Sequence, residues 1–309
     1  MGNVTPPAVK EFIIQGLSQI REVQLFLCAL LLVFYLIILP GNILIIVTIR
    51  NDPHLKSPMF FFLANLALLD LCYSCVTPPK LMFNTFSGYT TISYVSCITQ
   101  LFFIHFLGGA EMFLLIAMAI DRYVAICHPL RYATLVTRVV CWAMVVASWT
   151  GGFIHSIIQV ILIVLLPFCG PNELDNFFCD INQIIRLACA NTYALEYFMF
   201  VSSGLVSSAC FVLLLVSYSA LLVKIRKSGD QGKSKASSTC ITHIIIAFIM
   251  FGPAIYIYSR PFLDFPFDKV VAFFHTVVFP LVNPMIYTMR NKEIKAAIWK
   301  LLKKYSILR

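Results

Sequence analysis

Residues 24–49 read QLFLCALLLVFYLIILPGNILIIVTI, a stretch that contains no charged side chain. An α-helix needs about 20 consecutive apolar residues to cross roughly 30 Å of bilayer hydrocarbon, so this stretch predicts a membrane-spanning helix. Similar apolar runs recur along the rest of the chain. The expected spans, with edges defined to within a few residues, are 24–49, 58–83, 97–120, 139–165, 196–223, 239–259 and 270–289. The fold predicted from these runs is an all-α seven-transmembrane helix bundle.

The overall composition leads to the same fold class. About 60% of the 309 residues are hydrophobic and 12% are charged, against roughly 45–50% and 25% in soluble domains. The spans use most of the chain, so we expect a single seven-transmembrane domain over residues 1–309. It would comprise an N-terminal segment (1–23), the helix bundle (24–289) and a C-terminal tail (290–309).

The positive charge is distributed unevenly. The net charge is +9, and most Lys and Arg residues fall in the segments that are cytoplasmic if the N-terminus is extracellular. This bias is typical of cytoplasmic loops flanking membrane spans, and it favours contact with membrane lipids over nucleic acid. It predicts a multi-pass plasma-membrane protein with a cytoplasmic C-terminus. The sequon Asn3-Val4-Thr5 agrees, because glycosylation at Asn3 requires a lumenal N-terminus.

Two terminal segments carry further information. The first 23 residues lack a signal-peptide pattern, so the first span is expected to act as its own insertion signal. In the tail, residues 292–304 alternate basic and apolar side chains, which predicts a short amphipathic helix on the inner leaflet. The alternative for this helix is packing on another protein.

Four of the eleven cysteines lie on the expected extracellular side, at positions 97, 169, 179 and 189. That compartment is oxidising, so disulfides are expected there. Four cysteines allow three pairings, and their spacing does not choose among them. The remaining seven are interpreted as small buried residues.

Several motifs in a fixed order carry a family resemblance. Residues 117–132 read AMAIDRYVAICHPLRY, residues 58–63 read PMFFFL, residues 235–240 read KASSTC and residues 280–287 read PLVNPMIY. With Gly41-Asn42 in the first span, this pattern resembles the olfactory receptors, a branch of the rhodopsin-like G-protein-coupled receptors. The sequences of these motifs are similar to those of the land-vertebrate class of olfactory receptors. The chain departs from the usual pattern at Ile120 and at Met250-Phe251-Gly252.

The resemblance implies a function and a covalent framework. It implies a receptor, not an enzyme, that binds small volatile odorants and activates the stimulatory olfactory G protein to raise cyclic AMP. It also implies the disulfides Cys97–Cys179 and Cys169–Cys189, which would hold a loop over the extracellular mouth of the bundle.

The ligand pocket, carried over by position, lies in the outer half of the bundle. Its expected residues come from the third, fifth, sixth and seventh spans: Ile104, His105, Gly108, Gly109, Met199, Ser202, Ser203, Val206, Ser207, Phe251, Ala254, Ile255, Tyr258, Phe273 and Thr276. The set is mostly apolar with scattered hydroxyls, which favours small neutral ligands bound chiefly by desolvation. His105 is expected either to contact the ligand or to be satisfied by a neighbour, and His155 and His275 are weaker candidates.

Coupling residues are expected at the cytoplasmic side. Arg122 has an acidic neighbour in Asp121, and its planar fork can exchange partners, which would make a two-state latch. The residues that the resemblance assigns to activation are Asp121, Arg122, Tyr123, Leu130, Arg131, Tyr218, Asn283, Pro284 and Tyr287. Pro253, Pro280 and Pro284 each remove a backbone hydrogen bond and predict kinks.

Two acids are expected deep in the hydrocarbon. Asp70 and Glu111 cannot both stay bare in a low dielectric, so they share a cation or one of them is protonated. The resemblance suggests a sodium site beside Asn42 and Asn283; a structural hydrogen-bond network is the alternative. No other cofactor is expected.

Other functions have weaker support. A transporter would favour repeated halves, and we find no internal repeat. An intramembrane hydrolase would need a nucleophile and a base on facing helices, and no G-x-S-x-G elbow occurs. A non-olfactory rhodopsin-like receptor is the closest alternative; its usual tryptophan in the sixth span is replaced here by Phe251.

Overall fold

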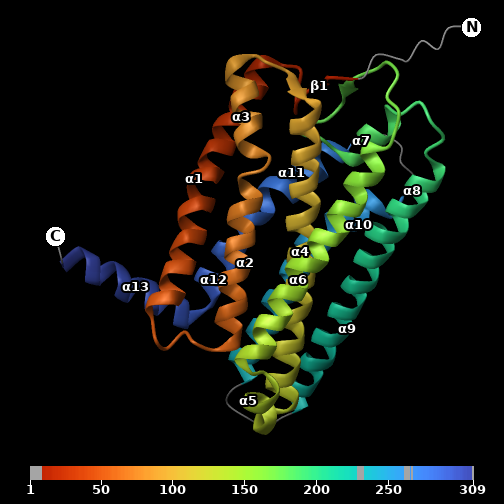
Figure 1. Cartoon of the computed structure of the whole chain (residues 1–309). Helices are drawn as coiled ribbons and strands as arrows, with labels where there is room; N and C mark the ends of the chain where they lie inside the picture. The colour runs from red at the N-terminus through yellow and green to blue at the C-terminus, as the bar shows by residue number, and fades with distance from the viewer. Residues whose placement is uncertain (1–8, 228–232, 261–264, 266, 308–309) are drawn as a thin grey trace, which may run out of the picture.

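The computed structural model of the chain is a bundle of long helices (Figure 1). It describes residues 9–227, 233–260, 265 and 267–307, without the side chains of 227, 233–236, 238–239, 283–284, 287–290 and 304–307. The elements are β1 (Glu11–Ile14), α1 (Arg21–Asn51), α2 (Pro58–Ser74), α3 (Pro78–Ser87), β2 (Thr91–Ser93), α4 (Tyr94–Cys127), η1 (Pro129–Arg131), α5 (Tyr132–Leu135), α6 (Arg138–Val164), β3 (Glu173–Leu174), α7 (Ile181–Arg186), α8 (Tyr193–Met199), η2 (Phe200–Leu205), α9 (Val206–Lys227), α10 (Lys233–Tyr258), α11 (Asp268–Phe273), η3 (Phe274–Val278), α12 (Phe279–Arg290) and α13 (Lys292–Ile307).

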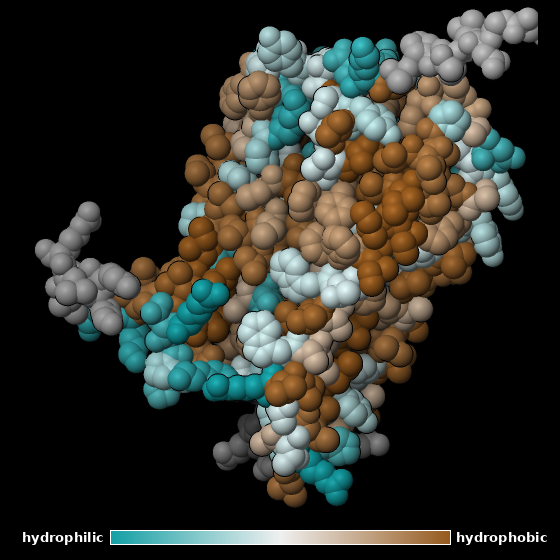
Figure 2. All heavy atoms as spheres, in the orientation of Figure 1, coloured by the Kyte–Doolittle hydropathy of each residue, from teal (hydrophilic) through white to brown (hydrophobic). Residues whose placement is uncertain are grey.

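The seven predicted spans appear as helices or consecutive helical segments, which confirms the fold class. Among the described residues, six helices are long and apolar enough to cross a membrane: 21–51, 58–87, 94–127, 138–164, 193–226 and 240–258. The seventh runs through α11, η3 and α12. The chain is a multi-pass membrane protein. Figure 2 shows the corresponding surface, on which hydrophobic residues dominate the middle of the bundle and hydrophilic residues gather toward its two ends.

The second span differs from the continuous helix that we predicted over 58–83. It breaks between Ser74 and Pro78, and α3 then continues to Ser87. Pro78 and Pro79 lack the backbone N–H that a continuing helix would need, whereas proline is well placed in the first turn of a new helix. The break therefore falls where the prolines allow a helix to start again.

Two spans contain a π-helical turn. The fifth span widens at η2, between α8 and α9, and the seventh widens at η3, immediately before Phe279 and Pro280. A proline removes one hydrogen bond from the helix preceding it, and π turns are a recognised way of absorbing such a change. The fifth span has no proline, and its π turn was not predicted.

One end of the bundle, called here the β1 end, is closed by a cap of strands and loops. β1 pairs antiparallel with β2 and parallel with β3 in a three-stranded sheet. Both implied disulfides are present: Cys97–Cys179 joins α4 to the loop before α7, and Cys169–Cys189 closes that loop. We call residues 165–192 the lid. The opposite end, which carries η1 and α5, is called the α5 end.

The tail forms a helix as predicted. α13 turns away from the bundle at the α5 end (Figure 1). Ile294 and Ala297 are buried against the bundle, whereas Trp299 and Leu302 are exposed. Part of the apolar face that we assigned to the membrane surface therefore packs on the chain itself.

The tightest helix contact joins α4 and α6. A Cβ atom added to Gly152 would lie 2.5 Å from the backbone nitrogen of Ala110 and 2.5 Å from the carbonyl oxygen of Phe106. One turn further along α6, Ser156 donates a hydrogen bond of 2.6 Å to the carbonyl of Phe102. Small residues allow helix backbones in a membrane to approach this closely.

Replacing Gly152 by alanine should therefore destabilise the bundle. The added methyl group meets backbone atoms that cannot move without separating α4 from α6, and overpacking of this kind costs about 1–3 kcal/mol. Gly252→Ala in α10 is the matched control, because a Cβ there meets nothing within 4 Å. Thermal unfolding in detergent should show a lower midpoint for Gly152→Ala alone; equal midpoints would contradict this account of the contact.

Candidate functional site

A cavity of about 70 Å³ lies inside the bundle. Its wall is built by α4, α6, η2, α9, α10 and η3. The lining residues are Ile104, His105, Gly108, Gly109, Met112, Phe113, His155, Ser202, Ser203, Val206, Ser207, Cys210, Ala254, Tyr258 and His275. We call this space the central cavity. Aliphatic, aromatic and small residues alternate with a few hydroxyls and imidazoles, so its chemistry suits a small and mostly apolar molecule.

Three histidines from three spans approach the central cavity. The ring of His105 lies 6.3 Å from that of His155 and 5.9 Å from that of Tyr258. His275 comes from η3, and its ring is 6.1 Å from that of Tyr73. Among the described residues, no cluster of three or more His, Cys, Asp or Glu side chains could hold a metal ion.

Several polar groups of the wall already have partners. The amide nitrogen of Gln159 donates to Ser203 Oγ at 2.8 Å and lies 3.0 Å from His155 Nε2. Ser207 Oγ lies 3.6 Å from Met112 Sδ. These bonds link α6 to η2 and α9 to α4, and they hold the cavity walls together.

Two polar atoms of the wall have no partner within the described part of the chain. Ser202 Oγ and His275 Nδ1 are both buried, and neither has a hydrogen bond. An unpaired polar atom in a buried site costs roughly 1–3 kcal/mol. A ligand that offers a hydroxyl or carbonyl group could satisfy one or both of them.

The sequence-predicted ligand residues fall into two groups. Ten of them line the central cavity. The other five lie nearby: Met199 is buried under the lid, Phe251 stacks on Phe211, Ile255 packs on the core, Phe273 meets Phe177, and Thr276 lines a smaller adjoining cavity.

Three lining residues were missed in the sequence. Met112 lies one helical turn after Gly108, so its helical spacing was a usable signal. Phe113 follows it in α4, and Cys210 lies in α9, where its placement depends on the π turn at η2.

The adjoining cavity lies between the central cavity and the lid. It shares Ile104, Tyr258 and His275 with the central cavity and adds charged residues of the lid and of the ends of the sixth and seventh spans. Arg260 forms an ion pair with Asp268, and its guanidinium lies 4.3 Å from the ring of Tyr256. The charged groups therefore gather on the lid side of the central cavity.

The lid is fixed to the bundle near the adjoining cavity. The backbone N–H of Cys179 donates to Gln100 Oε1 at 2.9 Å. Asp180 caps α7 by accepting from the N–H of Asn182 at 3.3 Å. Burial raises the pKa of Asp180 to about 6, against the opposing effect of this backbone hydrogen bond.

The two predicted membrane acids are buried. Asp70 in α2 is 1% exposed and Glu111 in α4 is 2% exposed, and both have interactions with other groups. Asn42 in α1 is fully buried, and its Oδ1 atom has no donor among the described residues. The side chain of Asn283 lies outside the described residues.

At the α5 end, Arg122 is paired with its neighbour. Its Nη2 and Nε atoms donate to Asp121 Oδ2 at 2.7 and 3.1 Å. The hydroxyl of Tyr132 donates to the other carboxylate oxygen at 2.7 Å. Burial, followed by this hydrogen bond, raises the pKa of Tyr132, so its hydroxyl remains a donor.

The other predicted activation residues lie on α4, η1, α9 and α12. Tyr218 in α9 is hydrogen bonded to His243 in α10 at 2.7 Å, a partner that was not predicted. Tyr123 and Arg131 are exposed, and Leu130 is 99% exposed. Pro284 and Tyr287 belong to α12, but their side chains lie outside the described residues.

Comparison with known proteins identifies close relatives. The sequence model of the olfactory receptor family matches residues 31–305. Human olfactory receptor 4M1 is 60% identical over 299 residues, covering 96% of each chain, and its mouse counterpart is equally similar. Human olfactory receptor 4N5 is 59% identical over 297 residues, again covering 96% of each chain.

The stability of the lid should depend on pH through Asp180. Its raised pKa means that the folded state holds a proton that the unfolded state, with an ordinary value of 3.8, has lost. Stability should therefore fall as the pH rises from about 4 through 6. Thermal unfolding midpoints at pH 5 and pH 7.5 should differ less in Asp180→Asn, which keeps a capping side chain. The exposed lid variant Glu173→Gln is the control, and an unchanged pH dependence in Asp180→Asn would contradict the prediction.

Proposed function

The chain belongs to the olfactory receptor family, and we propose that its central cavity is where it binds odorants and that it signals through a stimulatory G protein. As an odorant receptor it has no catalytic role. The observation that carries the proposed binding site is the pair of unpaired polar atoms, Ser202 Oγ and His275 Nδ1, in a cavity whose lining contains no charged residue among those described.

The cavity favours small neutral ligands. No Lys, Arg, Asp or Glu is among the described residues that line it, so an ionic ligand would lose its hydration without gaining a partner. Burial of the apolar part of an odorant contributes about 25 cal/mol per Å². One hydroxyl or carbonyl group then orients the molecule toward Ser202 or His275. The preferred ligands are small apolar molecules with a single oxygen-bearing group.

We place the β1 end outside the cell and the α5 end in the cytoplasm. Both disulfides lie at the β1 end, and disulfides persist in the oxidising extracellular compartment. The loops at the α5 end and the tail carry most of the basic residues, as cytoplasmic loops do. These two arguments are independent.

Coupling is proposed to depend on the Asp121–Arg122 pair. In this structure the carboxylate of Asp121 is occupied on both oxygens, by Arg122 and by Tyr132. This is the off arrangement of a latch, and the on arrangement frees Arg122 for the G protein. The fully exposed Leu130, beside Arg131, offers an apolar contact for the same partner.

The helices that line the cavity also reach the latch. α10 contains Pro253 close to the cavity residue Ala254, and its other half carries His243, the partner of Tyr218. Movement of α10 about Pro253 would transmit a change in the central cavity to the Asp121–Arg122 pair. An odorant promotes that movement only to the extent that it binds the active arrangement more tightly.

A sodium ion near Asp70 and Glu111 is part of the proposal. The two buried acids and the unpaired Oδ1 atom of Asn42 supply oxygen ligands, which suit a hard cation. When bound, the cation would compensate the negative charge of the two carboxylates. A shared proton is the alternative for the same pair.

Ser202→Ala should weaken the response to odorants that carry a hydroxyl or carbonyl group. Loss of one hydrogen bond worth about 1.4 kcal/mol corresponds to a roughly tenfold higher half-maximal concentration. The control is Ser208→Ala, because that hydroxyl is already bonded to the Gly204 carbonyl at 2.8 Å. Cyclic AMP reporter assays over an odorant panel measure both, and equal shifts in the two variants would argue against the central cavity.

Arg122→Ala should abolish odorant-stimulated cyclic AMP while surface expression stays within about twofold of wild type, since Arg122 lies at a helix end and is partly exposed. Arg138→Ala, which removes an exposed arginine at the same end of the bundle, should signal normally. A normal response in Arg122→Ala would remove the latch from the mechanism.

A further inference from the structure

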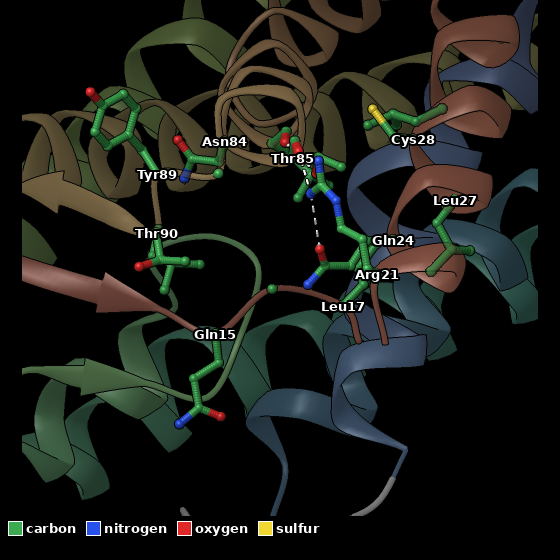
Figure 3. Close-up of a pocket in the computed structure, with 15 residues that line it drawn as sticks. Gln15, Leu17, Arg21, Gln24, Leu27, Cys28, Asn84, Thr85, Tyr89 and Thr90 are labelled. Atoms are coloured by element: carbon green, nitrogen blue, oxygen red, sulfur yellow. Dashed lines mark hydrogen bonds between the residues drawn. The ribbon is translucent and has the colours of Figure 1, made fainter. Parts of the chain in front are cut away.

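A second cavity lies at the β1 end, outside the helix bundle core. It is a partly open pocket formed by the segment after β1, the first turns of α1 and the end of α3 (Figure 3), and Arg21, Tyr89 and Thr90 in its lining are exposed. Its volume is about 170 Å³, more than twice that of the central cavity, and the two cavities share no lining residue. We call it the outer cavity. Its existence does not depend on the function proposed for the central cavity.

One wall of the outer cavity is polar and positively charged. The guanidinium of Arg21 is held in place because its Nη1 atom donates to the Thr85 carbonyl at 2.6 Å and to Gln24 Oε1 at 3.3 Å. Both bonds use Nη1, so the Nε and Nη2 donors remain for a ligand. Within the described part of the chain, the lining contains no Asp or Glu, and Arg21 is its charged residue.

The wall opposite Arg21 contains a second unsatisfied group. Figure 3 shows the carboxamide of Asn84 between Tyr89 and Thr85, across the cavity from Arg21 and Gln24. Its Oδ1 atom is buried and has no hydrogen-bond partner among the described residues. The terminal torsion of asparagine is soft, so rotation of the carboxamide exchanges Oδ1 and Nδ2, and Asn84 can present either an acceptor or a donor at this position.

The rest of the lining is apolar. Leu27 and Leu31 lie one helical turn apart on α1, and Leu81 faces them from α3. Leu31, Leu81 and the thiol-bearing Cys28 are buried. A molecule that fills the cavity would therefore meet both hydrogen-bond donors and hydrocarbon, which α1 and α3 each supply.

We propose that the outer cavity is a second ligand site and that it takes a small amphiphile with a carboxylate head and an apolar tail. The planar guanidinium of Arg21 matches a carboxylate geometrically, and Asn84 can donate to the same head group. The tail lies along Leu27, Leu31 and Leu81. Such an acid can come from the extracellular water or from the bilayer.

Equilibrium binding of radiolabelled hexanoate to the receptor in nanodiscs tests this site, with empty nanodiscs as the background. Saturable binding is expected for wild type, and Arg21→Gln should weaken it at least tenfold. Arg138→Gln is the matched control at the α5 end. Gly108→Leu fills the central cavity instead, where an added Cβ has only an ordinary contact of 3.8 Å with Tyr73, and it should bind hexanoate normally.

Competition experiments identify the head group that the outer cavity binds and show whether the ligand comes from the water or from the bilayer. Hexanol has the same tail without the charge and should not displace hexanoate. If dissolved acids are the ligand, hexanoate should compete at least as well as dodecanoate; stronger competition by dodecanoate would assign the site to acids from the bilayer. Both of these outcomes keep a carboxylate in the outer cavity.

Cysteine labelling gives a second, independent measurement. Cys28 lines the outer cavity and Cys210 lines the central cavity. Hexanoate should slow modification of Cys28 by a small neutral methanethiosulfonate at least threefold, without slowing modification of Cys210, as followed by peptide mass spectrometry. The proposal is overturned if hexanoate shows no saturable binding, if Arg21→Gln binds like wild type, if hexanol competes equally, or if Gly108→Leu alone abolishes binding.

Discussion

The absence of water from the bilayer interior is the constraint on which this structure depends. Every backbone N–H and C=O group in the hydrocarbon must find its partner within the protein, so each crossing is helical. The same constraint explains the exceptions. The break at Cys75–Thr77 and the turns η2 and η3 lie where prolines or neighbouring helices allow the backbone bonds to be rearranged. Departures from α-helix geometry are therefore confined to a few turns, and η2 and η3 both contribute residues to the central cavity.

Small residues convert this helical frame into a specific shape. Gly152 brings α4 and α6 into backbone contact, and Gly204 brings η2 against the backbone of Tyr258. Gly108 has the opposite effect: among the described residues only Tyr73 lies within 4 Å of a Cβ atom added there, so space is left in the central cavity. Close approach at some glycines and open space at another together determine where the cavity lies. The size of the cavity is then set by backbone positions as much as by side chains.

Much of the fold could be predicted from apolar runs and charge bias, because the bilayer imposes both directly on the sequence. The site was less accessible. Ile104, His105 and Gly108 share one face of α4 and were predicted, whereas Met199 and Phe251 lie just outside the cavity, because the rotation of a helix depends on its neighbours. The strand β1 was not predicted, although Phe12 and Ile14 alternate with more exposed residues as strand residues do. Four residues are too few for that pattern to stand out.

The sheet at the β1 end also has a consequence for the order of events in biosynthesis. β1 is among the first segments to be synthesised, yet it pairs with Thr91–Ser93 and with Glu173–Leu174. At about 5–20 residues per second, the ribosome reaches β3 on the order of ten to thirty seconds after β1. During that interval the first strand has no complete set of partners. The closing of this sheet marks the moment at which the first four spans have all been inserted.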